Sequence, residues 1–259
     1  MKRVLALMLA LLMLCTLVAC KDEQNEDDET GVDMTVENNE KVYTAEGEFN
    51  DRFTYEYIRG DEVAIVGFES ADVQHAITIP SVIDDRPVTK IEDRAFYHMT
   101  NLTGVTIPEG VTDIGDQAFA KCNVLTIVSL PSTLTAIGEA AFAYCAALDG
   151  IVIPATVTDI GGSLFVGCAK LSSIALPEAV KAVGEYMFMN CVSLRTVTWS
   201  TQLEEIGQHA FSGCTALTVT FPATVKTIGD YAFAGCTNVA APTLPEATIG
   251  TNAFYKPAV

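Results

Sequence analysis

The sequence predicts a β-rich solenoid built from repeats of about 23 residues. Segments of 23 residues that share one pattern begin at Leu102, Leu125, Leu148 and Leu171. Phenylalanine recurs with nearly the same period, as Phe96, Phe119, Phe142, Phe165, Phe188, Phe211, Phe233 and Phe254. Proline recurs with a similar period, as Pro108, Pro131, Pro154, Pro177, Pro222 and Pro245. One unit of this length cannot bury its own apolar side chains, so neighbouring units must stack and share a core.

The chain begins with the features of an export signal. Lys2 and Arg3 precede an unbroken apolar run from Val4 to Leu14. That run is shorter than a membrane-spanning helix, which needs about 20 residues. Small residues follow it, as they do before the cleavage site of a secretory signal peptide. We therefore expect residues 1–19 to be a signal peptide, and an uncleaved anchor helix is the alternative.

Cys20 is the candidate for lipid attachment. The tetrapeptide Leu17-Val18-Ala19-Cys20 resembles the lipobox of bacterial lipoproteins. The resemblance implies cleavage before Cys20 and acylation of this residue, which would anchor the mature protein to the membrane. Several acyl chains bind a membrane far better than one, because each buried CH₂ contributes about 0.8 kcal/mol. An ordinary signal peptide followed by an incidental cysteine would leave the same pattern.

Residues 20–48 have the composition of a linker. Between residues 21 and 40 the chain carries nine acidic residues and one lysine. A segment with few apolar residues and a block of like charge cannot form a core, so we expect an acidic, disordered spacer. The whole chain has 15 Lys and Arg against 33 Asp and Glu, a net charge of −18. This balance argues against a nucleic-acid partner, because phosphate binding needs clustered cations.

Each repeat predicts a short strand, a second extended piece and a short helical turn. In the first repeat, Val105 and Ile107 alternate with a threonine, which is the period of a half-buried strand. Pro108 ends this strand because it cannot donate to a ladder. Gly115 is expected to supply a turn that other residues would strain to make. The spacing of Ala118, Phe119 and Cys122 suits a single helical turn.

The repeat closely resembles the BspA-type (Treponema pallidum-type) leucine-rich repeats of bacterial surface proteins. The resemblance rests on the register I-P…I-G-x-x-A-F-x-x-C and covers about residues 77–259. It implies a leucine-rich repeat solenoid over 77–259. It also implies an N-terminal capping hairpin over 49–76, with its turn at Gly60-Asp61. The family resemblance further implies adhesion at a cell surface, often to a protein of a host or of a neighbouring cell.

Six cysteines recur once per repeat, which leaves three interpretations open. The column consists of Cys122, Cys145, Cys168, Cys191, Cys214 and Cys236. A disulfide ladder suits an oxidising compartment, and a metal site would use thiolate ligands. The column lacks a C-x-x-C pair, and the three histidines fall outside its period, so metal is the weakest interpretation. Small buried thiols that fill one core slot explain all six, and we favour them. Trp199 stands at an inward strand position, which favours a core role over ligand stacking.

The outward strand positions are the candidate ligand-facing residues. They are Thr103, Thr106, Thr126, Ser129, Asp149, Val152, Ser172, Ala175, Arg195 and Thr198. This surface is rich in Ser and Thr, nearly uncharged and free of histidine. The chain shows no phosphate loop, nucleophile–base pair or paired carboxylates, so we expect no enzyme activity, cofactor or metal. Solenoids offer extended surfaces to protein ligands. We therefore expect a lipid-anchored, protein-binding module, and the alternative is a passive spacer of the cell envelope.

Overall fold

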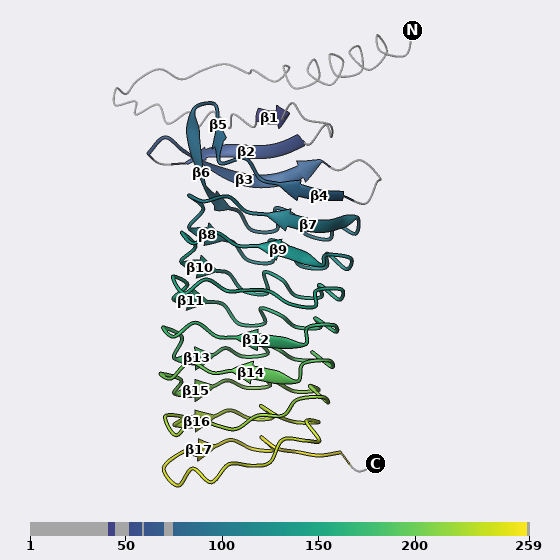
Figure 1. Ribbon diagram of the computed structural model, residues 1–259, viewed down its shortest axis with the longest axis vertical. Coiled ribbons are helices and arrows are strands. Elements are labelled where there is room, and N and C mark those ends of the chain that lie inside the picture. Colours follow the sequence, from purple (N-terminus) through teal and green to yellow (C-terminus); the bar gives the residue numbers. More distant parts are fainter. Residues whose placement is uncertain (1–40, 45–51, 59, 70–74, 258–259) are drawn as a thin grey trace, which may run out of the picture. The chain divides into compact units, whose positions relative to one another are not determined.

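The computed structural model describes residues 41–44, 52–58, 60–69 and 75–257. The predicted signal peptide and Cys20 lie outside these residues. The described residues belong to one compact unit, in which the coils stack one on another along a single axis (Figure 1). The predicted β-solenoid is confirmed. Within the range 20–48, which we expected to be linker, Lys41–Thr44 forms strand β1 and pairs antiparallel with β2.

A hairpin precedes the first coil. Strands β2 (Arg52–Ile58) and β3 (Glu62–Glu69) pair antiparallel, and the turn between them has positive φ at Gly60 and Asp61. β3 then pairs in parallel with β6 (Arg86–Ile91), so the hairpin continues the stack of coils. β5 (Val82–Ile83) pairs with β6 through a turn in which Asp84 and Asp85 also have positive φ. The hairpin therefore covers the apolar end of the first coil, where Val63 and Ile65 are fully buried.

Two rows of short parallel strands run along the stack. The first row contains β4 (His75–Thr78), β7 (Leu102–Thr106), β9 (Ile127–Ser129), β12 (Ser173–Ala175) and β14 (Thr196–Thr198). The second row contains β8 (Asp113–Ile114), β10 (Ala136–Ile137), β11 (Asp159–Ile160), β13 (Ala182–Val183), β15 (Glu205–Ile206), β16 (Thr227–Ile228) and β17 (Thr248–Ile249). The register advances by one repeat per coil, as in the pairs Ile114↔Ile137 and Ile137↔Ile160.

Consecutive turns take the place of the expected helical turn. The described residues contain no helix. After Gly115, the N–H groups of Ala118 and Ala120 donate to carbonyl oxygens three residues earlier, whereas those of Phe119 and Lys121 donate to the next coil. This alternation needs left-handed backbone at every fourth residue, with φ of 55° at Gln117 and 64° at Lys121. The segment thus forms a third ladder between coils, because every second N–H group donates to the next coil.

The glycine column has a different cause from the one expected. Gly115 lacks the positive φ of the left-handed region. A Cβ added there would lie 2.6 Å from the backbone nitrogen of Asp93 in the preceding coil. The same close approach recurs at Gly138, where a Cβ would lie 2.6 Å from the backbone nitrogen of Asp116. Glycine is therefore required because adjacent coils touch backbone to backbone, and not because of a turn.

The core consists of columns of equivalent side chains, with one member of each column per coil. The phenylalanine rings lie nearly parallel, with centroid distances from 4.8 Å between Phe96 and Phe119 to 6.0 Å between Phe142 and Phe165. Leucine, isoleucine and cysteine columns pack around them and are almost completely buried. Each internal ring therefore packs against a ring of the coil before it and a ring of the coil after it.

The ladders are interrupted in the middle of the stack. The sheet that contains β11 ends there, and the sheet that contains β13 begins in the next coil. Gly161 N–H donates to the Ile137 carbonyl and Gly207 N–H to the Val183 carbonyl, both at 2.8 Å. Within the described backbone, the equivalent bond from Gly184 to Ile160 is not made. The first row of strands also lacks a member between β9 and β12.

Candidate functional site

The structure places the predicted ligand-facing residues on one side of the coils. Nine of the ten side chains are exposed: Thr106, Thr126, Ser129, Asp149, Val152, Ser172, Ala175, Arg195 and Thr198. Thr103 is half-buried. We call this surface the strand side. Several hydroxyls on it are already bonded to the preceding coil. Thr126 Oγ1 donates to the Thr103 carbonyl at 3.0 Å, and Ser172 Oγ to the Asp149 carbonyl at 3.2 Å.

A further column of the strand side was missed by the sequence analysis. It holds Gly104, Ile127, Gly150, Ser173 and Thr196, which lie between the two outward columns that were predicted. The most apolar member is Ile127, whose residue surface is 67% exposed. The sequence contained a sign of this column. Two consecutive variable positions follow the leucine of each repeat, and strict alternation of inward and outward side chains explains only one of them.

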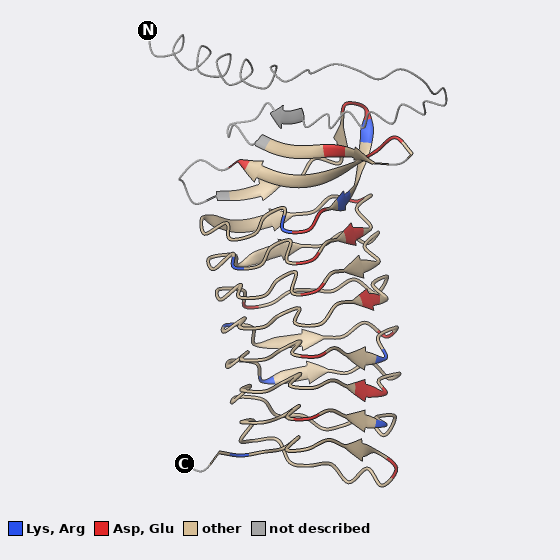
Figure 2. Cartoon of the chain, turned by 180° about the vertical axis from the view of Figure 1, so that it is seen from behind, with Lys and Arg blue, Asp and Glu red and all other residues tan. Residues whose placement is uncertain are grey.

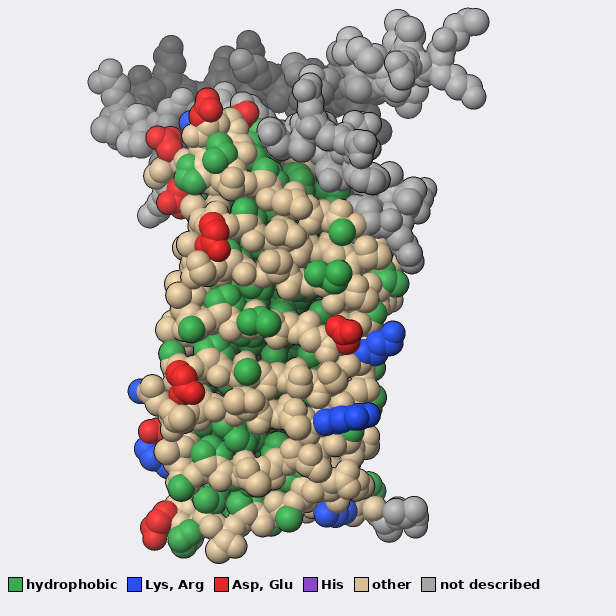
Figure 3. All heavy atoms as spheres, in the orientation of Figure 1, with side chains coloured by type: hydrophobic (Ala, Val, Ile, Leu, Met, Phe, Trp, Pro, Cys, Tyr) green, Lys and Arg blue, Asp and Glu red, His purple; other side chains and the backbone are tan. Residues whose placement is uncertain are grey.

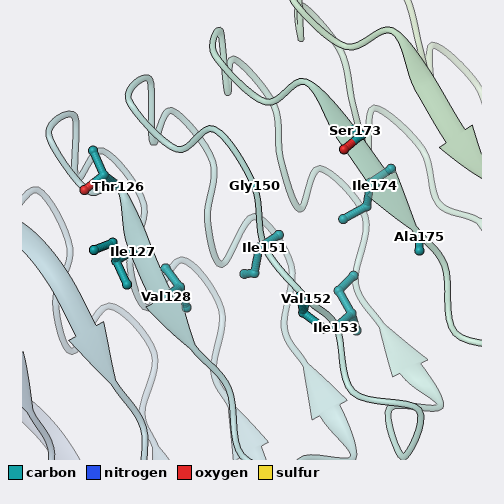
Figure 4. A pocket seen from close by; sticks show the side chains of 10 residues that line it. All are labelled: Thr126, Ile127, Val128, Gly150, Ile151, Val152, Ile153, Ser173, Ile174 and Ala175. Carbon is teal, nitrogen blue, oxygen red and sulfur yellow. The ribbon is translucent and has the colours of Figure 1, made fainter.

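An apolar groove crosses the strand side at the interruption of the first row. Its volume is about 530 Å³, and all of its lining residues are uncharged. Ile127 and Val128 of β9 line one margin, Ile174 and Ala175 of β12 the other, and Val152 lies between them (Figure 4). Val152 is 83% exposed, the highest value among the exposed large hydrophobic residues of the described chain.

The groove is open because backbone pairing is lost there. Elsewhere on this side, Ile107 N–H donates to the Ser129 carbonyl and Leu176 N–H to the Thr198 carbonyl, both at 3.0 Å. In the described backbone around residues 150–153, the equivalent bonds to Val152 and from Ile153 are not made. Gly150 has no side chain to pack against neighbours, and a Cβ there would meet no atom within 4 Å.

Charge is sparse on this part of the molecule. Figure 3 shows a face on which charged side chains lie near the margins, whereas hydrophobic and uncharged polar groups fill the middle. Asp149 and Arg195 are exposed, and neither lines the groove. A partner that docks in the groove would therefore pay little desolvation of charge.

The six column cysteines are buried free thiols in this structure. Each Sγ donates to the backbone carbonyl of a phenylalanine in the preceding coil, at 3.2 Å for Cys122 to Phe96 and 3.0 Å for Cys214 to Phe188. Burial raises the pKa of Cys122, Cys191 and Cys236 to about 12. Thiols protonated at neutral pH are poor nucleophiles and poor metal ligands. No group of three or more His, Cys, Asp or Glu in the described chain is arranged to hold a metal ion.

Trp199 serves the core. Its ring packs edge-on against Phe211 at a centroid distance of 5.7 Å, and its Nε1 donates to the Thr220 carbonyl at 2.7 Å. Ser200, which replaces the proline of other repeats, is fully buried and donates to the Glu178 carbonyl. With its indole N–H bonded and its ring packed, Trp199 is only partly exposed.

The repeat register decides the family. A model of the BspA type leucine rich repeat region matches residues 68–195 and 158–258, with six copies of the repeat. The chain belongs to the BspA-type leucine-rich repeat family. No curated protein matches the sequence at a significant level.

The fold is similar to solved structures of bacterial leucine-rich repeat proteins. A leucine-rich repeat protein of T. pallidum has 29% identity and a TM-score of 0.70, over 79% of this chain and 97% of that one. A leucine-rich cell surface protein of Faecalibacterium prausnitzii has 26% identity and a TM-score of 0.61, over 83% of this chain and 73% of that one. No helix among the described residues of this BspA-type chain is long and apolar enough to cross a membrane.

Proposed function

We propose that this chain is a lipid-anchored cell-surface protein that binds another protein through the groove on its strand side. The observation that carries the proposal is the exposure of Ile127 and Val152 in one uncharged groove. Isolated exposed aliphatic side chains are common, but a cluster of them in a groove is typical of interaction sites. Repeat solenoids are also well suited to binding proteins, because their sides are extended surfaces.

The position at the cell surface is supported by two further observations. The sequence Leu17-Val18-Ala19-Cys20 resembles the lipobox of exported and acylated proteins. The F. prausnitzii relative, which shares the fold, is described as a cell surface protein. An acidic linker after the anchor would hold the solenoid away from the membrane, because a segment of like charge is extended by its own repulsion.

The groove can be tested by photo-crosslinking on the full-length chain. The protein carrying a benzophenone amino acid at position 152 is added to intact cells of the kinds that share the habitat of the bacterium. It should crosslink to one protein on these cells, and the yield of this crosslink should saturate. The additional substitution Ile127→Asp should abolish this crosslink, because it buries a charge in an apolar contact. Val192 is the control position: it is 45% exposed but outside the groove, so Val192→Asp should leave the crosslink unchanged.

The result would separate the proposal from its alternative. A passive spacer of the cell envelope would give diffuse crosslinks that neither substitution changes. The strand side has few of the Trp, Tyr and Arg residues that dominate most interfaces, with Arg195 the one exposed arginine among the predicted positions. A diffuse pattern that persists in the Ile127→Asp variant would contradict a specific binding function for this groove.

A further inference from the structure

A second groove lies on the side of the coils that is formed by the consecutive turns. We call it the turn groove. Its volume is about 350 Å³, and its floor consists of Ala120, Ala143 and Val166, which are nearly buried. Three tyrosines line it: Tyr97, Tyr144 and Tyr186. None of its lining residues belongs to the strand-side groove.

The three tyrosines present rings and hydroxyls to the turn groove. Tyr97 is 37% exposed and Tyr144 50% exposed. Tyr186 stacks on His209 at a centroid distance of 5.1 Å with one face of its ring, and it lines the groove as well. In the described chain, no hydrogen bond is made by the hydroxyl of any of the three, whereas the Tyr231 hydroxyl accepts one from Asn252. These hydroxyls are therefore free to donate to a ligand.

The tyrosines are spaced at every second coil. Tyr97, Tyr144 and Tyr186 belong to the coils of Phe96, Phe142 and Phe188, at three different positions of the repeat. Since adjacent coils are about 4.8 Å apart, every second coil is about 10 Å apart and the groove is about 19 Å long. A polyproline II helix repeats every three residues at about 3.1 Å each, so one turn is about 9.3 Å and six residues span about 19 Å.

One carboxylate lines the turn groove, and two more occupy its repeat position in nearby coils. The first is that of Glu139, and the other two are those of Asp116 and Glu185. All three side chains are exposed, and within the described chain none of them forms a salt bridge. Acidic residues recur from coil to coil along this part of the molecule (Figure 2). The one cation that lines the groove, Lys121, already lies 5.1 Å from the Tyr97 ring centroid.

From these features we infer that the turn groove binds a proline-rich segment of a protein in the polyproline II conformation, with basic residues beside the prolines. Proline rings stack on aromatic side chains, and the carbonyl groups of this conformation lack internal hydrogen bonds. The spacing of the coils that carry the tyrosines is close to the length of its turns, and the tyrosine hydroxyls can donate to its carbonyl groups. These carboxylates form no salt bridge within the described chain, so they complement arginine or lysine in the segment and would repel an acidic one.

An added β-strand does not fit this groove. Its backbone N–H groups are committed to other parts of the stack, as in the bonds from Lys121 to Ala143 and from Tyr144 to Val166. Strand addition needs a free sheet edge. A polyproline II segment needs no backbone ladder, since it is held by side-chain packing and by donors to its carbonyl groups.

Binding can be measured by fluorescence anisotropy with the full-length chain in detergent. The probe is a dye-labelled peptide of about eight prolines, enough for two turns and more, with arginine pairs at both ends. One control peptide replaces the prolines by alternating glycine and serine, and a second replaces the arginines by glutamates. The first peptide should bind best, and its affinity should fall with added salt because exposed charges are screened.

Matched variants locate the site. Tyr144→Ala should weaken the affinity for the arginine–proline peptide by about tenfold or more, the scale of an aromatic hot spot. Tyr144→Phe should weaken it less, because only the hydroxyl is lost. Tyr255→Ala is the control, since Tyr255 is 51% exposed in the last described coil and lies outside the groove, and it should change the affinity by less than about twofold. Glu139→Gln should reduce the preference for arginine over glutamate flanks.

Several outcomes would overturn the inference. They are equal binding of the proline and glycine–serine peptides, equal loss in Tyr144→Ala and Tyr255→Ala, and binding of neutral oligosaccharides but not of the proline peptide. Thermal melts of each variant show whether the fold is retained, and Tyr144→Phe keeps the ring if Tyr144→Ala does not fold. Val152→Asp on the strand side should leave peptide binding unchanged, so this test is independent of the proposed function.

Discussion

The thiol of Cys168 donates a hydrogen bond to the backbone carbonyl oxygen of Phe142, with 3.2 Å between Sγ and O. Phe142 lies in the coil before Cys168, and the same contact joins Cys191 to Phe165 and Cys145 to Phe119. The Phe142 carbonyl also accepts the backbone N–H of Cys145 at 3.3 Å, so the thiol is its second donor and links the two coils. The column is a set of hydrogen-bond donors between coils as well as a set of small core side chains.

Stability should fall at alkaline pH because of this column. Burial raises the pKa of the thiols in the folded chain above the value of 9.0 expected for a free thiol, to about 12 for Cys122, Cys191 and Cys236. Between pH 9 and 12 the unfolded chain therefore binds fewer protons than the folded one. Each thiol then lowers the free energy of unfolding by about 1.4 kcal/mol per pH unit, and the loss is absent below pH 9.

Urea melts in the presence of a reductant, at several values of pH from 8 to 10.5, would measure this slope. Cys168→Ala should be less stable than the wild type at pH 8. Its free energy of unfolding should fall less steeply with pH, by the equivalent of about one proton released on unfolding. Leu171→Ala is the control, because it weakens the same region of the core without removing a thiol and should keep the wild-type slope. Identical slopes in all three proteins would contradict the protonated, buried thiols.

Phenylalanine substitutions should depend on position in the stack. Phe142 stacks between Phe119 and Phe165, whereas Phe254 is half-buried, stacks on Phe233 with one face and meets Phe221 edge-on. Phe142→Ala or Phe165→Ala should cost about 3–5 kcal/mol, the usual range for this change in a core. Phe254→Ala should cost about 1 kcal/mol, because a coil with one neighbour frays. Denaturant melts with equal losses in all three variants would be inconsistent with stacked coils.

Two glycines should respond in opposite ways to the same change. A Cβ at Gly138 would lie 2.6 Å from the backbone of Asp116, whereas a Cβ at Gly150 meets nothing within 4 Å. Gly138→Ala should therefore destabilise by about 1–3 kcal/mol or more through overpacking. Gly150→Ala should be neutral or stabilise by up to about 1 kcal/mol, since alanine restricts the unfolded chain. The pair can be compared by thermal unfolding, and a larger loss at Gly150 would refute the close approach of the coils.

Acylation of Cys20 has a direct test. Metabolic labelling with an alkyne fatty acid should mark the wild-type protein and leave Cys20→Ala unmarked. A Cys15→Ala variant serves as the control, because Cys15 lies inside the predicted signal peptide and would be removed with it. Equal labelling of the wild type and Cys20→Ala would end the lipoprotein hypothesis.

The positions of the repeat could be predicted from the sequence because each has one physical cause. Phe119, Val111 and Ile114 repeat with the coil and are buried as expected. The outward positions followed from the alternation around Val105. The turn segment could not be predicted, because most of its left-handed positions hold residues such as Gln117 and Lys121, and glycine takes the place of Lys121 only in the later coils, as Gly167, Gly213 and Gly235. Tertiary hydrogen bonds to the next coil impose that backbone, against local preference.

The candidate sites were only partly predictable for the same reason. The residues of the strand side were named from their alternation, but the groove depends on a missing strand between β9 and β12. Gly150 was a usable signal, since glycine in a strand weakens it. The turn groove was not predicted, because its tyrosines occupy three different positions of the repeat: Tyr97 follows Phe96 directly, Tyr144 is two residues after Phe142, and Tyr186 is two before Phe188.

The break between β11 and β13 has a mechanical meaning. At the other described coil boundaries the second row of strands and the turn ladder carry a load along the stack together, and the first row adds to them at the pairs β4–β7, β7–β9 and β12–β14. Between the coils of Phe165 and Phe188 the described backbone keeps the turn bonds, such as Phe165 N–H to the Met187 carbonyl, and one strand-side bond from Ser172 to Asp149. A solenoid pulled from its two ends therefore stretches and bends first at this boundary. This boundary divides the stack into an N-terminal and a C-terminal segment, each stiffer than the connection between them.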